Sequence, residues 1–464
     1  MPFEFLYLLI MLAIIGIIFV VFKRPIYEAM IITYVVLVVI IALNPNFANV
    51  GIGNIFTYMW ATSTNMLFYA IVAFLCAAQV FTSTKVINSV IGTILSIFGR
   101  FRGGAALVSL IGTTFMATLT GSGAGNVAAT GVFTIPAMKK SGMPSHLAAN
   151  IEAATSTLGN SIPPSGIIIL SFGALTAFYT DIGQENPYTM TTFWFILWGI
   201  SLYFLLHRFL MTYIFIRYYK VTPMPASEIP NFKTSVKEGW KALLLPLIIF
   251  TPFILDANFQ DFFTLRIGPA RAAITANLLQ FTAGVAAIYA VVIARKHVKV
   301  NPAAMASVFT KAIKSIIPIT STIFFAYCLA ALFADIGLGP AVSAYFEGLG
   351  LSFVLLAFLL PLFTAIVGMV IPGSSQVAIF GSAIVGIMVA SGAHPLLIAA
   401  MLPSITGAME GMTPPMALCT YTAMGIAQSP FKETVVNSLY WIGFHYVISV
   451  ILMLGMLPIL WFPY

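Results

Sequence analysis

Long apolar stretches separated by short polar segments run along the whole chain. Each is long enough, or nearly so, to cross a hydrocarbon core of roughly 30 Å as a helix. The first ends at Lys23-Arg24 without a small-residue cleavage site, so we expect a spanning helix rather than a removed signal peptide. The pattern predicts an all-α polytopic membrane protein without a soluble domain between its spans. Examples of these stretches are residues 5–22, 27–43, 66–81, 191–216 and 435–460.

A short polar string interrupts the apolar pattern in the first half of the chain. From Gly103 an apolar run reaches the small-residue string GSGAGN at 121–126 and returns to Lys139-Lys140. Both legs are short for full spans, and basic residues flank both ends, as in cytoplasmic loops. We therefore predict a re-entrant hairpin with its tip near the middle of the membrane. The earlier basic loops, at 23–24 and 85–102, place the amino terminus outside by the same rule.

The next apolar span, residues 146–179, is interrupted by the proline pair Pro163-Pro164. A proline ring removes one backbone donor and clashes with the preceding turn, so this span should be a broken helix.

Both interruptions recur in the second half of the chain. Ser122 and Pro163-Pro164 match Ser374 and Pro414-Pro415 at offsets of 250 to 252, and other pairs at this offset include Gly131 with Gly381. The charges place the second hairpin, with legs 351–371 and 377–390, so that it enters from the outside. An odd number of spans in each half makes the two repeats opposite in orientation, which is the architecture of alternating-access carriers.

The repeat divides the chain into units. Two amphipathic stretches, residues 85–100 and 336–348, precede the hairpins at similar offsets, and we interpret them as interfacial arms that join a scaffold to a moving unit. The expected units are scaffold and first arm (1–102), first hairpin, broken helix and following span (103–220), scaffold and second arm (221–350), and second hairpin, broken helix and last span (351–464).

Composition agrees with this assignment. The chain is 60% hydrophobic and 7% charged, against about 25% charged residues in an average soluble domain. The net charge of +8 comes from basic residues in short loops, so it indicates cytoplasmic loops rather than nucleic-acid binding. The three cysteines, Cys76, Cys328 and Cys419, have neither paired nor metal-type spacing, which predicts reduced, packed thiols.

Four breaks at membrane depth suggest a binding site. Backbone that leaves the helix inside a membrane must be buried in protein or line a wet cavity. Such breaks offer carbonyls and hydroxyls to a hard cation such as Na⁺, and helix amino termini to an anion. For any one residue, close helix packing explains a glycine or serine about as well as ligation does. The predicted cation ligands are Thr120, Ser122, Gly123, Asn126, Gly159, Asn160 and Ser161 in the first repeat, and Gly373, Ser374, Ser375, Gly411 and Thr413 in the second.

The substrate should be a small organic carboxylate. No Lys or Arg lies within 121–131, 159–173 or 373–425, so backbone amides and hydroxyls would have to bind the anion, with Na⁺ nearby adding attraction. We expect no cofactor apart from the coupling ion. The predicted substrate contacts are Ser122, Pro163, Pro164, Ser165, Gln376, Pro414 and Pro415.

Two carboxylates, Glu152 and Glu410, lie in the broken spans. An intramembrane carboxylate is a candidate for proton coupling or for ordering a cation. The alternative is a glutamate that faces a water-filled cleft or is hydrogen-bonded to a neighbouring serine. Na⁺ and H⁺ therefore both stay open as coupling ions.

Three strings resemble one transporter family. They are GSGAGNVAATGVFTIPAMKKSG at 121–142, STLGNSIPPSG at 156–166 and EGMTPPMALCTYTAMGIA at 410–427. They are similar to the large membrane subunit of tripartite ATP-independent periplasmic (TRAP) transporters, and especially to the branch in which the large and small membrane subunits are fused. One departure is GPARAAIT at 268–275, where many members have a Thr-Glu-Ala-Ala type of motif.

The resemblance implies an elevator mechanism driven by a cation gradient, usually Na⁺, in the inner membrane. It also implies two partners, a small membrane subunit and an extracytoplasmic substrate-binding protein, and an organic-acid substrate. The chain has only the spans of a large subunit, so the small subunit is separate or absent. Without it, the protein would be a stand-alone Na⁺- or H⁺-coupled carboxylate carrier of the same superfamily. A channel would not need two inverted hairpins, and a membrane enzyme would need a catalytic cluster that the apolar segments lack.

Overall fold

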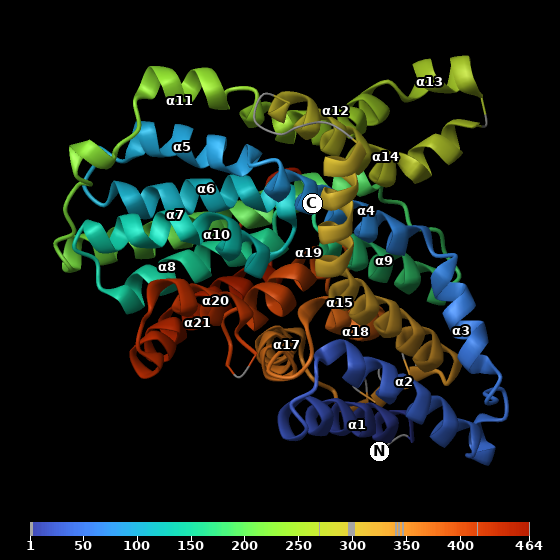
Figure 1. The fold of residues 1–464 in the computed structure, drawn as a ribbon. Coiled ribbons are helices and arrows are strands. Elements are labelled where there is room, and N and C mark those ends of the chain that lie inside the picture. The colour runs from blue at the N-terminus through green and yellow to red at the C-terminus, as the bar shows by residue number, and fades with distance from the viewer. Residues whose placement is uncertain are drawn as a thin grey trace.

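The computed structural model describes residues 3–268, 270–295, 302–338, 341, 344–345, 348–414 and 416–463, which form helices joined by short connections and contain no strand (Figure 1). The first ten helices are α1 (Phe3–Gly16), α2 (Ile26–Ala42), α3 (Asn54–Ser63), α4 (Met66–Ser83), α5 (Val86–Phe98), α6 (Gly104–Thr120), α7 (Gly123–Lys140), α8 (Ser145–Ser156), α9 (Gly166–Asp181) and α10 (Met190–Tyr218). The later ones are α11 (Phe232–Gly239), α12 (Leu245–Asn258), α13 (Gln260–Ile267), α14 (Ala270–Ala294), α15 (Pro302–Asp335), α17 (Phe353–Val367), α18 (Gly373–Ala390), α19 (Pro395–Pro403), α20 (Leu418–Ala427) and α21 (Phe431–Met453).

Six helices of the described chain contain an apolar segment long enough to span a membrane: α4, α10, α14, α15, α18 and α21. Several other apolar helices, including α6, α9 and α17, are shorter. These shorter helices include hairpin legs and halves of broken spans, which is why the apolar stretches of the sequence do not all become full-length helices. The all-α polytopic fold is therefore confirmed.

The first hairpin turns at Gly121 and Ser122. Gly121 ends α6 with φ +58°, and a Cβ at this position would lie 2.8 Å from the Ser165 Cα atom, so both the conformation and the close approach favour glycine. Ser122 is the N-cap of α7, and its Oγ accepts a hydrogen bond from the Gly125 amide at 3.3 Å. The small-residue string of the sequence thus forms a tight turn between two helices.

The second repeat has the same order of helices with different local chemistry. Helices α7 and α18 begin 250 residues apart, at Gly123 and Gly373, and so do α8 and α19, at Ser145 and Pro395. The N-cap of α18 is Pro372, and Ser374 is the second residue of the helix. Ser122 and Ser374 therefore do not occupy equivalent positions, although the sequence pattern pairs them.

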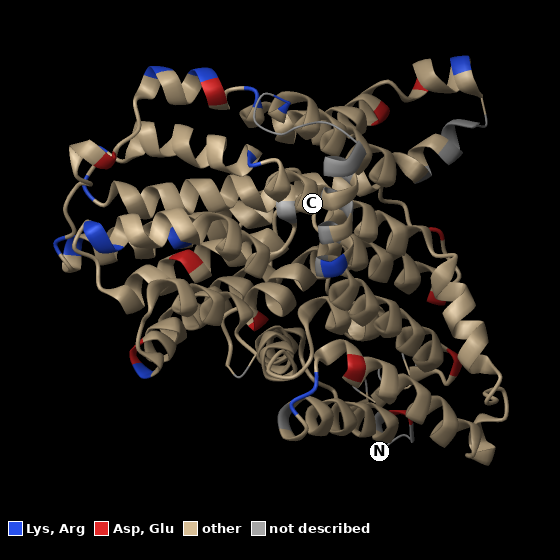
Figure 2. Cartoon of the chain, in the orientation of Figure 1, with Lys and Arg blue, Asp and Glu red and all other residues tan. Residues whose placement is uncertain are grey.

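The two repeats pack across each other. Helix α7 of the first hairpin packs against α20, and α18 of the second hairpin packs against α9. At the open end of the first hairpin, Lys139 Nζ donates to the Ala427 carbonyl at the end of α20 (2.8 Å). At the open end of the second, the His394 ring lies 3.5 Å from the Tyr188 hydroxyl, beyond the end of α9. The hairpins thus open at opposite ends of the molecule, and Figure 2 shows many of the Lys and Arg residues near the end of α7.

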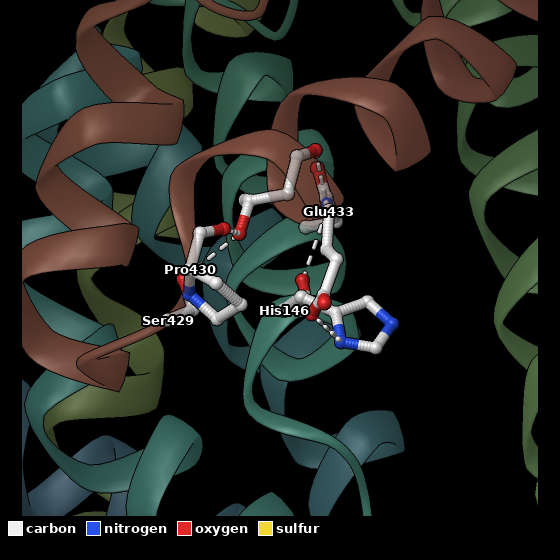
Figure 3. A network of polar contacts seen from close by, with 6 residues as sticks. His146, Ser429, Pro430 and Glu433 are labelled. Carbon is white, nitrogen blue, oxygen red and sulfur yellow. Dashed lines mark hydrogen bonds and ion pairs between the residues drawn. The ribbon is translucent and has the colours of Figure 1, made fainter.

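Polar contacts also fix the start of α21 against the start of α8 (Figure 3). Asn150 Nδ2 donates to the Thr434 carbonyl at 2.9 Å. His146 Nδ1 lies 3.7 Å from the Glu433 carboxylate, and Thr434 Oγ1 donates to the Pro430 carbonyl at 2.7 Å. The last helix is therefore attached to the first broken helix at this end of the bundle.

The first predicted arm forms α5, which is amphipathic and packs between α6 and α11 with Val90, Ile91 and Ile94 buried. Within the second predicted arm, 336–348, residues 339–340, 342–343 and 346–347 lie outside the described residues. The division of the chain into scaffold and transport units stays a prediction.

Candidate functional site

The four interruptions of the two repeats meet at one cavity of about 260 Å³, called the central cavity below. The first repeat contributes Gly121, Ser122, Gly123 and Ala124 from the hairpin turn, and Asn160, Gly166 and Ile167 from the break between α8 and α9. The second contributes Pro372, Ser374, Gly407, Glu410, Gly411 and Cys419. Apolar residues of α2, α4 and α15, among them Ile26, Ile71, Leu75, Ile319 and Ile323, form the opposite wall.

A larger cavity of about 780 Å³ lies between α6, α10 and α12. Its walls are aliphatic and aromatic apart from three threonines. A binding site for an anion and a cation needs converging polar groups. The central cavity has them, and we take it as the candidate site.

Glycines let the backbone segments around the central cavity touch. A Cβ on Gly373 would lie 2.4 Å from Gly407 Cα, and one on Gly159 would lie 2.7 Å from Asn126 Nδ2. A Cβ on Gly123 or on Gly411 would come within 2.8 Å of Cys419 Sγ. Close packing alone is thus sufficient to explain why glycine occupies these four positions.

Asparagine side chains fix the wall of the first repeat. Asn160 Nδ2 donates to the Gly407 carbonyl at 2.7 Å, which ties the first break to the second. Asn126 is fully buried, and its Nδ2 donates to the Ser156 carbonyl at the end of α8 (3.3 Å). Both amides therefore bind backbone carbonyls next to the breaks, and the Gly407 carbonyl also accepts from the Gly411 amide at 3.3 Å.

The second repeat contains oxygen atoms without hydrogen-bond partners. Ser375 Oγ and Gln376 Oε1, in the first turn of α18, are buried and have no partner among the described residues. Gln376 Nε2 donates to the Ile371 carbonyl at 3.0 Å, which fixes the amide orientation. Such orphaned acceptors in a buried site call for a ligand, a water or an ion.

Glu410 reaches the amino terminus of the second hairpin helix. Its Oε2 accepts a hydrogen bond from the Gly373 amide at 3.0 Å, while the side chain lines the central cavity and is 8% exposed. At the start of α20, the Cys419 and Thr420 amides donate to the Gly411 carbonyl at 3.0 and 3.3 Å, whereas the Leu418 amide has no hydrogen-bond partner in the described part of the chain.

The amino termini of the first repeat differ from those of the second. Ser122 and Ser165 cap α7 and α9 by accepting from the third amide of each helix, those of Gly125 and Ile168. The earlier amides, at Gly123, Ala124, Gly166 and Ile167, have no hydrogen-bond partner in the described part of the chain, and all four residues line the central cavity. The sequence predicted anion-binding termini in both repeats. The structure leaves four such amides open at the cavity in the first repeat and two, those of Ser374 and Leu418, in the second.

Glu152 lies away from the central cavity. It is fully buried among α6, α7 and α8, where Ser109 and Thr134 donate to its Oε2 at 2.6 and 2.5 Å, and Thr130 also donates to the carboxylate. This geometry matches the alternative of a hydrogen-bonded structural glutamate.

The predicted site residues fall into three groups according to where they lie relative to the central cavity. Ser122, Gly123, Asn160, Ser374, Glu410 and Gly411 line the central cavity. The side chain of Thr120, and Pro415 as a whole, lie outside the described residues. The others do not line it; they are Asn126, Glu152, Gly159, Ser161, Pro163, Pro164, Ser165, Gly373, Ser375, Gln376, Thr413 and Pro414.

Sequence reasoning missed a buried cation on α10. Arg208 is fully buried, and its guanidinium donates to the Ala154 carbonyl, to Thr157 Oγ1 and to Nδ1 of His207 and His445. A single arginine inside an apolar span is itself a signal, because charged groups at membrane depth are rare and have a partner.

The chain matches a family model over residues 9–460, that of the "Tripartite ATP-independent periplasmic transporter, DctM component". It belongs to this family. The resemblance of the three sequence strings is therefore confirmed, and the protein is a multi-pass inner-membrane protein of a family of transport permeases rather than of enzymes.

Two relatives with known names illustrate the match. The C4-dicarboxylate TRAP transporter large permease DctM of Pseudomonas aeruginosa is 30% identical over 193 residues, which cover 41% of this chain and 42% of the relative. The isethionate TRAP transporter permease DctMQ of Oleidesulfovibrio alaskensis is 40% identical over 72 residues, 16% of this chain and 11% of the relative. The aligned segments thus span less than half of each relative.

Solved structures share the fold. The YdaH transporter of Alcanivorax borkumensis superposes with a TM-score of 0.62 and 16% identity, over 93% of this chain and 97% of that one. MtrF of Neisseria gonorrhoeae, an antimetabolite efflux pump, gives 0.59 and 13% identity, over 87% and 84%. At this identity the likeness concerns the fold alone, and that fold occurs in membrane transporters.

Proposed function

We propose that this protein is the large permease subunit of a TRAP transporter that imports a small organic carboxylate across the inner membrane, driven by a Na⁺ gradient through an elevator movement. The observation that carries the proposal is the central cavity, where both hairpin turns and both helix breaks of an inverted pair of repeats converge. One site at the repeat interface is what alternating access requires, because either side of the membrane can then reach it in turn.

Oxygen atoms near the cavity support Na⁺ as the coupling ion. Ser375 Oγ and Gln376 Oε1 lack hydrogen-bond partners, and Glu410 adds a carboxylate to the wall. Oxygen-only ligand sets suit hard cations. Among the described residues, no cluster of His, Cys, Asp and Glu could hold a transition metal.

Open helix amino termini support an anionic substrate. The unpaired amides of α7 and α9 point to an oxyanion, since each helix amino terminus carries roughly half a positive elementary charge. The names of the relatives agree with a small organic anion, as one is named for C4-dicarboxylates and another for isethionate.

The family match also supports two partners, a small membrane subunit and an extracytoplasmic substrate-binding protein. The fused name of the isethionate relative, DctMQ, fits a permease that works together with a second membrane component.

Uptake by reconstituted protein tests this function. The full chain, with the partner proteins encoded beside it where they exist, should take up a labelled C3 or C4 carboxylate only under an inward Na⁺ gradient. Replacing Gln376 by Leu should raise the Na⁺ concentration for half-maximal uptake about fivefold, since one lost polar ligand costs about 1 kcal/mol. The control Gln184→Leu, exposed between α9 and α10, should leave it unchanged. Full uptake with choline in place of Na⁺ contradicts Na⁺ coupling and favours a proton carried by Glu410.

A further inference from the structure

Among the described residues, most of the open amides and the one carboxylate around the central cavity belong to different repeats. In the first repeat, four residues with unpaired amides, Gly123, Ala124, Gly166 and Ile167, line the cavity. In the second repeat, Glu410 occupies the Gly373 amide and the Gly411 carbonyl occupies those of Cys419 and Thr420, so that in the described part of this repeat only the amides of Ser374 and Leu418 stay unpaired at the cavity. The first repeat therefore offers more open amides to an anion, while the second presents a carboxylate.

We propose that the substrate is a compact monocarboxylate and that Glu410 discriminates against dicarboxylates. This inference rests on the proposed function and specifies its substrate class. It departs from what the name of the Pseudomonas aeruginosa relative suggests for that protein.

Glu410 lines the cavity with only one of its two carboxylate oxygens hydrogen-bonded. Its Oε2 is bonded to the Gly373 amide, while its Oε1 has no hydrogen-bond partner in the described chain, although the residue is more than nine-tenths buried. A second carboxylate on the substrate would face this oxygen across a cavity of only about 260 Å³. Two like charges in one buried site repel strongly, because little solvent screens them.

The wall that α4 and α15 form is mainly apolar. Ile71, Leu75, Ile319 and Ile323 line the side of α4 and α15, and a carboxylate placed against them would lose its water without gaining a hydrogen bond. The same side chains suit the small apolar body of a monocarboxylate.

No basic side chain of the described residues lines the central cavity. The buried Arg208 does not compensate, since its donors bind Ala154, Thr157, His207 and His445 behind the breaks. A Na⁺ ion bound at Glu410 would neutralise that carboxylate but would not turn it into an attractive partner for a second anionic group. The charge balance of the site thus favours one negative charge on the substrate.

A pair of probes of equal carbon number tests the inference. Butyrate and succinate differ in one terminal group, a methyl in one and a carboxylate in the other. Dissociation constants for the purified full chain in saturating Na⁺, from calorimetric titration, should show butyrate binding at least about tenfold more tightly than succinate. In Glu410→Gln, succinate should gain relative to butyrate and the ratio should fall by about tenfold.

Glu433→Gln is the matched control, because Glu433 is exposed at the start of α21 (Figure 3) and does not line the cavity. Its ratio should equal that of the original protein. Succinate binding as tightly as butyrate to the original protein overturns the inference but leaves a Na⁺-coupled carboxylate carrier intact. An unchanged ratio in folded Glu410→Gln also overturns it. If that variant does not fold, the ratio in the original protein decides alone. Binding of neither acid overturns the inference, while uptake by the reconstituted protein with its partners decides the proposed function separately.

Discussion

Arg208 on α10 donates through Nη2 to Nδ1 of His445 on α21 at 2.9 Å. Since Nδ1 accepts, the proton of the neutral imidazole is on Nε2, which donates to the Ser404 carbonyl at the end of α19, also at 2.9 Å. Arg208 Nε donates to the Ala154 carbonyl near the end of α8 at 3.2 Å. One buried guanidinium and one imidazole thus connect the two half-helices that precede the breaks.

Removing this connection should destabilise the protein strongly. Arg208→Met would leave Nδ1 of His207 and Nδ1 of His445 buried without a donor, at about 1 to 3 kcal/mol for each unsatisfied group. We expect a loss of about 3 kcal/mol or more in detergent, measured by thermal unfolding of the purified chain. Arg217→Met, in the exposed last turn of the same helix, should change stability by less than about 0.5 kcal/mol. Equal melting temperatures for the two variants would show that the Arg208 contacts contribute little.

The sequence predicted the hairpins and the first break because their signals are local. Small polar residues at 121–126 and the pair Pro163-Pro164 interrupt apolar runs. The apolar segments on either side of 121–126 are short for full spans, which identifies them as the legs of a hairpin. The occupied Gly373 amide could not be predicted in this way, since its acceptor, Glu410, is 37 residues away in the chain and reaches it through packing of the second break. The pairing of Ser122 with Ser374 was misleading because the two serines occupy different positions at their helix starts. Ser122 is the N-cap of α7, whereas Ser374 is the second residue of α18, after the N-cap Pro372 and Gly373.

The contact between Gly373 and Gly407 should not tolerate a methyl group. A Cβ on Gly373 would lie 2.4 Å from both the Cα and the N of Gly407, and backbone on both sides would have to move. Gly373→Ala should therefore abolish uptake or reduce it at least about tenfold, in line with overpacking costs of about 1 to 3 kcal/mol. Gly425→Ala, where nothing lies within 4 Å of the added carbon, should keep full uptake. Normal uptake by Gly373→Ala would mean that the two breaks do not touch during the transport cycle.

Glu152 should be a structural residue rather than a coupling residue. Its carboxylate accepts from four hydroxyls, those of Ser109, Thr130, Thr134 and Ser156, and does not line the central cavity. Glu152→Ala should lower stability by about 1 to 3 kcal/mol because buried hydroxyls lose an acceptor. The Na⁺ and substrate concentrations for half-maximal uptake should stay the same in the protein that folds. Thermal unfolding and uptake kinetics on the same preparation separate the two effects: unchanged melting with lost uptake would instead assign Glu152 to proton coupling.

Ser122 and Ser374 should become accessible together and from alternating sides. Both line the central cavity, although they come from hairpins that open at opposite ends of the molecule. A movement that opens this cavity to one side exposes both residues to that side, because the cavity is a single space of about 260 Å³. Cysteines at either position, in a chain whose Cys76, Cys328 and Cys419 have been replaced, should react with a membrane-impermeant maleimide from the outside in one condition and from the inside in another. Substrate with Na⁺ should slow both reactions. Labelling from the same side in every condition would contradict alternating access, and labelling of one position without the other would contradict a shared cavity.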